Sequence, residues 1–159
     1  MTRKEQYNQL ILQIAGLIKD ETNLVGILAN VSAALHDAFP ERFFWVGFYL
    51  QENGNMLRLG PFQGSVACYV IPFGKGVCGK AWEEGCTLIV PDVEKFPGHI
   101  ACSSLSRSEI VVPMYDDSHT FRGVLDIDST RLNDFNEDDK EGLERIIKLL
   151  MAETHDLFQ

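Results

Sequence analysis

The spacing of apolar residues changes twice along the chain, and these changes constrain the fold more than any other feature. Near both ends apolar residues recur every three or four positions, which predicts amphipathic helices over residues 2–19 and 24–39 and from Asn136 onward. Between residues 42 and 129 the apolar runs are short and bounded by turn-forming residues, which is typical of strands. Because turns join antiparallel neighbours, we expect an α+β fold with a mainly antiparallel sheet of about six strands and the terminal helices on one face.

The middle of the chain is expected to contain short strands and one short helix. The strands are predicted at residues 42–50, 56–60, 66–71, 86–90, 110–114 and 121–129, and the helix at residues 77–84. Asn53 and Gly54 form a hairpin signal between the first two strands. Pro61 is expected to begin a turn and Pro113 to end a strand, because proline cannot donate a backbone hydrogen bond. No repeat or low-complexity linker divides the sequence, so residues 1–159 are expected to form a single domain.

The charge of the chain excludes several classes of partner. It has 14 basic and 23 acidic residues and a formal net charge of −9, which argues against nucleic-acid binding and against docking on anionic lipid. No apolar run reaches the roughly 20 residues that span a bilayer. The first ten residues contain no apolar segment of the signal-peptide type. We therefore expect a cytoplasmic protein with no membrane or nucleic-acid partner.

The chain has 4 cysteines, at Cys68, Cys78, Cys86 and Cys102. No two of them form a CxxC pair, so neither a zinc site nor another metal cofactor is expected. A disulfide in a cytosolic protein would be catalytic or sensing rather than structural. Cys78 lies in the first turn of the predicted short helix, where the helix dipole is expected to lower the pKa of its thiol.

The cysteine Cys102 lies on a predicted loop that leads into a buried strand near Glu109. On that strand Glu109 and Val111 face one side of the sheet, while Ile110 and Val112 face the other. A loop cysteine beside a buried carboxylate suggests redox chemistry. The alternative is a buried thiol that only packs, because free cysteine is among the most buried residue types.

Two further strand faces carry candidate binding residues. Trp45, Gly47 and Tyr49 share a face, and the missing side chain between two rings suggests room for a small apolar group. The alternative is that these rings only cover a helix. Asp126 and Asp128 also share a face, which indicates either a polar site or solvated carboxylates at a sheet edge.

Six motifs resemble those of a known family over nearly the whole chain. They are FFWVGFYL (43–50), GPFQG (60–64), ACYVIPFGKGVCGKA (67–81), VPDVEKFPGHIAC (90–102), SEIVVPM (108–114) and GVLDIDS (123–129). Together they resemble the free methionine-(R)-sulfoxide reductases, a family built on a stand-alone GAF domain. The resemblance implies a GAF-like fold, an oxidoreductase and, as is usual in this family, a homodimer.

The resemblance also implies roles for the cysteines. Cys102 would be the nucleophile, Cys68 the principal resolving cysteine and Cys78 an accessory one. The residue after the nucleophile is commonly Asp in this family and is Ser103 here, so a charge from that position is not expected. Cys86 lies outside the trio and is interpreted as a packing thiol.

The same resemblance implies how the substrate, free methionine sulfoxide, is bound. Trp45 and Tyr49 would form an aromatic wall against the S-methyl group. Asp126 and Asp128 would bind the ammonium group. One acid among these two and Glu109, kept protonated by its neighbours, would donate to the sulfoxide oxygen.

The implied reaction needs thiols and no organic cofactor. Attack of Cys102 on the sulfoxide would release methionine and leave a sulfenic acid, which Cys68 would convert to a disulfide. A thioredoxin-type dithiol would then reduce that disulfide. The competing interpretation is a GAF module that senses a small ligand or an oxidant without turnover, and repeated conversion of methionine sulfoxide distinguishes the two.

Overall fold

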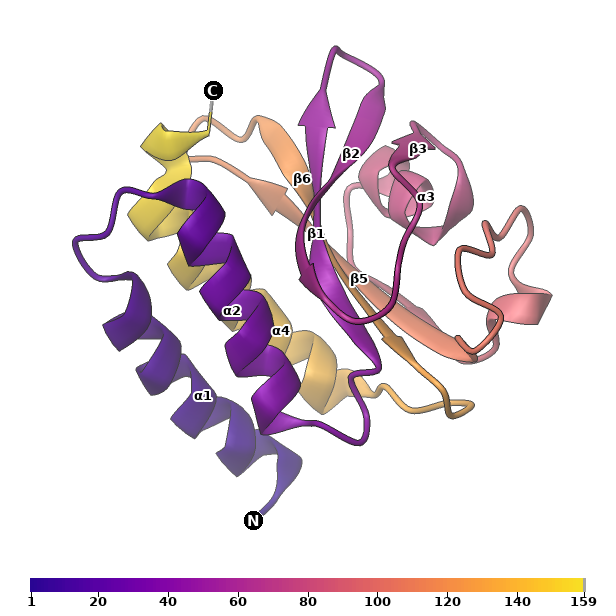
Figure 1. Cartoon of the computed structure of the whole chain (residues 1–159), viewed down its shortest axis with the longest axis horizontal. Coiled ribbons are helices and arrows are strands. Elements are labelled where there is room, and N and C mark those ends of the chain that lie inside the picture. The colour runs from indigo at the N-terminus through magenta and orange to yellow at the C-terminus, as the bar shows by residue number, and fades with distance from the viewer. Residues whose placement is uncertain (159) are drawn as a thin grey trace.

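The computed structural model describes residues 1–158. Its helices and strands are α1 (Arg3–Ile18), α2 (Leu24–Ala38), β1 (Trp45–Glu52), β2 (Met56–Gln63), β3 (Val70–Pro72), α3 (Gly76–Glu84), β4 (Leu88–Val90), β5 (Ser108–Tyr115), β6 (Phe121–Ser129) and α4 (Glu137–Thr154), with 3₁₀ turns at Val93–Lys95 and His155–Leu157. Within residues 1–158 the strands form one sheet of six, in the order β3-β2-β1-β6-β5-β4 (Figure 1). Every neighbouring pair is antiparallel, which confirms the predicted α+β class.

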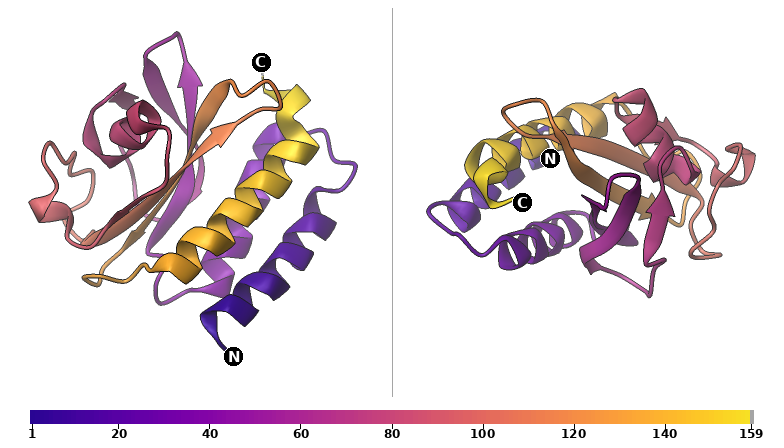
Figure 2. Two further views of the ribbon diagram at one scale, coloured as in Figure 1. Left: turned by 180° about the vertical axis from the view of Figure 1, so that it is seen from behind. Right: turned by 90° about the horizontal axis from the view of Figure 1, so that it is seen from above.

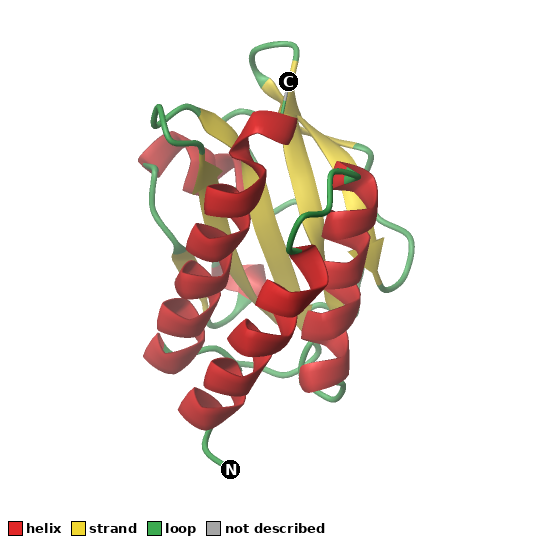
Figure 3. Ribbon diagram, turned by 90° about the vertical axis from the view of Figure 1, so that its left-hand side faces the viewer, coloured by secondary structure: helices red, strands yellow, loops and turns green. Residues whose placement is uncertain are grey.

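The long helices α1, α2 and α4 lie on one side of the sheet, as predicted (Figure 3). Helices α2 and α4 pack on the strands, and α1 packs on α2 and α4. Thr2 begins α1 with a capping box, in which its side chain accepts a hydrogen bond from the Glu5 N–H. No helix in the described part of the chain has the length and apolar character that crossing a membrane requires.

A buried charge network ties this helical layer together at one end of the sheet. Asp139, in the first turn of α4, is fully buried and accepts a 2.7 Å hydrogen bond from the Tyr7 hydroxyl. The guanidinium groups of Arg3 and Arg42 lie 2.8 and 3.0 Å from the same carboxylate. The network therefore connects α1, the segment before β1 and the start of α4.

The opposite face of the sheet is covered by α3 and by the loop between β4 and β5 (Figure 2). As the strand alternation predicted, Ile110 and Val112 face the long helices, whereas Glu109 and Val111 face α3. Polar and apolar side chains of neighbouring strands thus meet in the space under α3.

The predicted strand over residues 66–71 is wrong at its beginning. Only Val70–Pro72 forms a strand, and residues 64–69 form a loop. Besides the backbone hydrogen bond from the Leu59 N–H to the Tyr69 carbonyl at 3.0 Å, side chains of β1 hold this loop. The Trp45 indole N–H donates to the Ser65 carbonyl at 3.0 Å, and the Tyr49 hydroxyl donates to the Cys68 carbonyl at 2.9 Å. The loop therefore passes over the face of the sheet that carries the aromatic side chains.

Two prolines lie inside strands, contrary to the prediction that they interrupt them. Pro61 belongs to β2 next to an irregularity, where the register with β1 shifts between Gly47 and Tyr49. Pro113 belongs to β5 beyond Val111, the last β5 residue that pairs with β4. At both positions the missing N–H is tolerated, because proline fits bulges and unpaired strand edges.

Candidate active site

A cavity lies between the sheet and α3, and all but one of the candidate residues from the sequence line it. The lining includes Trp45 and Tyr49 from β1, Cys78 from α3, Cys102 from the β4–β5 loop, Glu109 from β5, and Asp126 and Asp128 from β6. The exception, Cys68, is joined to Cys102 by a disulfide. The structure therefore brings all eight predicted residues to one site.

The three acids converge because the strands that carry them, β5 and β6, are neighbours in the sheet. Glu109 is directly opposite Asp128 across the β5–β6 pair, and Asp126 is two residues along the same face of β6. Glu109 and Asp126 are buried, whereas Asp128 is partly buried. Because β6 is an inner strand, the alternative of solvated carboxylates at a sheet edge is excluded.

Burial and mutual repulsion keep protons on this acid cluster. Burial, followed by the charges of Asp126 and Asp128, raises the pKa of Glu109 well above its ordinary value. Burial likewise raises the pKa of Asp126 and of Asp128. Glu109 is opposite Asp128 and close to Asp126, so ionising all three carboxyl groups would bring three like charges together. The cluster therefore contains a carboxylic acid that can act as a proton donor near neutral pH.

Cys68 and Cys102 form a disulfide, the pairing that the family resemblance implied. Their Cα atoms are 5.5 Å apart, and the bond joins the loop after β2 to the loop before β5. Both residues are partly buried, so the disulfide is neither sealed in the core nor fully exposed. Burial raises the pKa of Tyr49, so its hydroxyl remains a donor to the Cys68 carbonyl and fixes this side of the disulfide.

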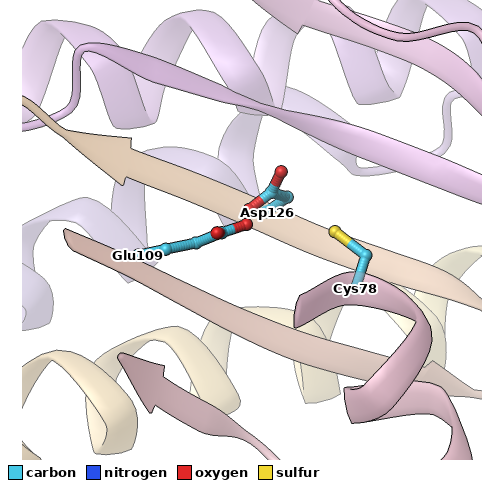
Figure 4. Close-up of side chains that lie close together, drawn as sticks. All are labelled: Cys78, Glu109 and Asp126. Carbon is cyan, nitrogen blue, oxygen red and sulfur yellow. The ribbon is translucent and has the colours of Figure 1, made fainter. Parts of the chain in front are cut away.

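The predicted low pKa of Cys78 is wrong. Cys78 is buried against β5 and β6, and burial, followed by the charges of Asp126 and Glu109, raises the pKa of its thiol well above the ordinary value. The Cys78 sulfur points toward the Asp126 carboxyl group and lies within 4.8 Å of one of its oxygens (Figure 4). Desolvation and neighbouring carboxylates thus outweigh the helix dipole, whose effect is about 1 kcal/mol at an exposed terminus.

The aromatic wall is present, but the predicted gap above Gly47 is filled. The rings of Trp45 and Tyr49 stack with their centroids 5.9 Å apart, and Phe62 stacks on Trp45 at 5.1 Å. A Cβ atom added to Gly47 would lie 2.2 Å from the Cβ of Phe62, so Phe62 uses the space that glycine leaves. The wall is therefore continuous. Trp45 and Tyr49 line the cavity and also pack in the apolar cluster beneath α3.

His99 is a cavity residue to which the sequence interpretation gave no role. Its Nε2 lies 3.9 Å from Glu109 Oε1, and burial lowers the pKa of the imidazole. The neutral ring therefore adds no fixed positive charge beside the acids. The sequence could have indicated this position, because His99 belongs to the HIAC block and lies three residues before Cys102.

Two smaller expectations concern Ser103 and Cys86. Ser103 lines the cavity, and its hydroxyl accepts a 3.2 Å hydrogen bond from the Leu105 N–H, so it shapes the loop and brings no charge. Cys86 was expected to pack inside the protein, but its side chain is exposed just after α3 ends at Gly85. That interpretation was wrong because Cys86 precedes β4 rather than belonging to it.

Comparisons with known proteins agree over nearly the whole chain. No family model matches the sequence. The chain is 57% identical over 149 residues to GAF domain-containing protein A of Dictyostelium discoideum, covering 94% of this chain and 92% of that protein. It is 44% identical over 155 residues to the free methionine-R-sulfoxide reductase of Saccharomyces cerevisiae, covering 94% and 86% respectively.

A solved structure gives the same result. The chain superposes, with a TM-score of 0.93 and 47% identity, on the free methionine-R-sulfoxide reductase of Neisseria meningitidis in complex with its substrate, covering 98% of this chain and 92% of that one. The sheet and its helices are thus those of a GAF domain, which confirms the predicted fold. On this similarity of sequence and structure, the chain belongs to the free methionine-R-sulfoxide reductase family of oxidoreductases.

Proposed function

We propose that this protein reduces free L-methionine-(R)-sulfoxide to methionine, with Cys102 as the nucleophile. One observation carries the proposal: the Cys68–Cys102 disulfide lies at a cavity that also contains a buried acid cluster and an aromatic wall. A thiol pair supplies two electrons, a carboxylic acid supplies a proton, and reduction of a sulfoxide consumes both. The relative from Neisseria meningitidis, which was solved with its substrate, supports this choice of substrate.

The acid cluster would recognise the ammonium group of the free amino acid. Asp126 Oδ1 is buried and has no hydrogen-bond partner within residues 1–158. A buried carboxylate oxygen without a partner is costly, so a cationic donor from the substrate would stabilise it. Asp128 would bring a second carboxyl group to the ammonium, and Trp45 with Tyr49 would lie against the S-methyl group. Methionine within a peptide has no ammonium group and would be rejected.

The chemistry would proceed in two steps at Cys102. In the reduced enzyme, the Cys102 thiolate attacks the sulfoxide sulfur while a protonated carboxyl group of the cluster, which we assign to Glu109, donates to the oxygen. The bond between the two sulfur atoms then breaks as the hydroxyl group passes from the methionine sulfur to the Cys102 sulfur, so methionine leaves and Cys102 becomes a sulfenic acid. The thiolate of Cys68 attacks the Cys102 sulfur, the hydroxyl group leaves as water with one proton, and the disulfide forms. A thioredoxin-type dithiol then reduces the disulfide and is itself oxidised.

Cys78 would be an accessory thiol in this scheme. It faces the same cavity, so it could exchange with Cys102 when the principal partner is missing. Its raised pKa favours the thiol form, which is a weaker attacking group than a thiolate. We therefore assign the resolving step to Cys68 first and to Cys78 second.

The proposal extends to the organisation of the protein. We propose that residues 1–159 act as one GAF domain, that the enzyme is a cytoplasmic homodimer, and that it needs no cofactor. A sensing module with a redox switch is the competing function. It would react once with an oxidant and stop.

Turnover separates these two functions. With dithiothreitol in excess, the enzyme is expected to release many equivalents of methionine from free methionine-(R)-sulfoxide and far less from the (S) epimer. A yield of one equivalent or less per chain, with the disulfide re-reduced by dithiothreitol, would contradict the proposal and favour the sensor.

A further inference from the structure

We propose that Cys78, Glu109 and Asp126 form a site for one divalent cation of the zinc type. The inference goes beyond the proposed function, because no step of that function uses a metal. It concerns the same cavity, yet it is tested by binding alone.

The geometry places three ligand atoms around one point. The Cys78 sulfur and one carboxylate oxygen each from Glu109 and Asp126 lie within 4.8 Å of one another (Figure 4). Zinc-to-sulfur and zinc-to-oxygen bonds of about 2.3 and 2.0 Å place tetrahedral ligand atoms roughly 3.3 to 3.6 Å apart. Side-chain rotations that bring the two most distant ligand atoms about 1 Å closer together would therefore complete the site.

The three side chains come from different elements that pack on one another. Cys78 lies on α3, Glu109 on β5 and Asp126 on β6, and α3 contacts both strands. All three residues are at most 6% exposed. The ligands are therefore held by the fold rather than by a loop, which limits the ordering entropy that binding would cost.

A second observation points to a cationic ligand. Asp126 Oδ1 is buried and lacks a hydrogen-bond partner among the described residues. Figure 4 shows the Cys78 sulfur directed toward the Asp126 carboxylate from the α3 side. Near the cluster Asp128 provides a further carboxyl group, while His99 lies beside Glu109 as a partly buried imidazole. The site thus has oxygen and sulfur ligand atoms whose negative charge, once they are deprotonated, a dication would neutralise.

The donor set selects the class of metal. One thiolate with two carboxylates suits zinc, cadmium or cobalt, which accept sulfur together with oxygen ligands. Magnesium and calcium require six or more oxygen ligands and avoid sulfur. Binding would release the Cys78 thiol proton, and any proton on the two ligating carboxyl groups, to solvent, and water would occupy the fourth position. Because these ligands lie 31 and 17 residues apart in the sequence, linear cysteine spacing could not have indicated the site.

The test is a titration of the oxidised protein with cobalt and zinc ions. In this state the disulfide removes Cys68 and Cys102 as ligands, so only Cys78 and Cys86 retain thiols. The proposal predicts one equivalent of bound cobalt with a sulfur-to-cobalt charge-transfer band in the near ultraviolet. Zinc should displace the cobalt, whereas excess magnesium or calcium should not.

Matched variants locate the metal. Cys86→Ser removes the exposed thiol and should leave the band and the affinity unchanged. Cys78→Ser should abolish the band and weaken binding by at least about tenfold, since losing a group that only hydrogen-bonds a metal ligand already weakens binding by about 10- to 100-fold. Asp126→Asn keeps the thiol and should weaken zinc binding by a similar factor. This variant provides the test if Cys78→Ser does not fold. Absence of the band in the wild type, or its loss in Cys86→Ser alone, would overturn the proposal, whatever the activity of the enzyme.

Discussion

Replacing Asp126 by Asn tests how the acid cluster selects its substrate. Asp126 is buried, and its Oδ1 has no hydrogen-bond partner within the described chain. In the proposed complex this oxygen pairs with the substrate ammonium. N-acetylated methionine-(R)-sulfoxide cannot supply that charge, and it leaves the carboxylate unpaired in the cavity.

The expected magnitude follows from the burial of this carboxylate. Leaving a buried charge without its partner costs on the order of 3 kcal/mol or more. Since about 1.4 kcal/mol changes an equilibrium or a rate tenfold, the wild-type enzyme should prefer the free amino acid by roughly a hundredfold or more in kcat/KM. Asp126→Asn removes the negative charge, so kcat/KM for the free substrate should fall sharply while that for the N-acetylated substrate changes little.

The assay compares kcat/KM for the two substrates in the wild type, in Asp126→Asn and in a control. Asp37→Asn is a matched control, because it makes the same chemical change at an exposed carboxylate outside the site. The rate of peroxide oxidation of Cys102 checks that the nucleophile is intact, and it should change less than the reaction with the free substrate. Nearly equal values for free and N-acetylated substrate in the wild type would refute the reasoning.

Three other perturbations address the nucleophile, the acids and the fold. Cys102→Ser should abolish turnover while the circular dichroism spectrum stays native, and substantial activity with dithiothreitol would contradict the assignment. Glu109 has a raised pKa in the folded protein, so between about pH 4 and that raised value the folded state binds more protons than the unfolded state and stability falls as pH rises. Between about pH 5 and pH 8, the free energy of unfolding measured with urea should therefore fall less for Glu109→Gln than for the wild type. An equal fall in both proteins would show that Glu109 does not titrate in this range. Asp139→Ala should destabilise the protein by about 3–5 kcal/mol, because it removes the buried carboxylate that pairs with Arg3 and Arg42 and accepts from the Tyr7 hydroxyl. Arg42 then keeps only its pair with Asp134, and a cost below about 1 kcal/mol would show that the network contributes little.

The convergence of the acids was predictable, because strand alternation is local. Glu109 on β5 and the Asp126–Asp128 pair on β6 each had to face one side of the sheet, and the family resemblance put those faces together. The α+β class followed in the same way from the change in apolar spacing. These features depend on residues that are close in sequence.

The errors depend on contacts between distant segments. The helix-dipole argument for Cys78 used only α3, whereas the pKa of the thiol is set by burial against β5 and β6. The space above Gly47 was assigned without knowing the β1–β2 register that places Phe62 there. Pro61 and Pro113 remain in strands because the neighbouring strand is irregular or absent at those positions, which no local pattern reveals.

The loop over residues 64–69 is a further case of this kind. Its sequence alternates like a strand, but hydrogen bonds from Trp45 and Tyr49 and the disulfide to Cys102 hold it out of the sheet. Tertiary contacts thus override local β propensity in the loop that carries Cys68.

A single-turnover experiment on the Cys68→Ser, Cys78→Ser double variant tests the central claim most directly. This variant retains Cys102 and the acid cluster but has no resolving thiol in the cavity. Mixed with free methionine-(R)-sulfoxide without reductant, it should release one methionine per chain and accumulate a sulfenic acid on Cys102, detected as a dimedone adduct by mass spectrometry. Release of no methionine, or an adduct on Cys86 instead of Cys102, would contradict the assignment of Cys102 as the residue that attacks the sulfoxide.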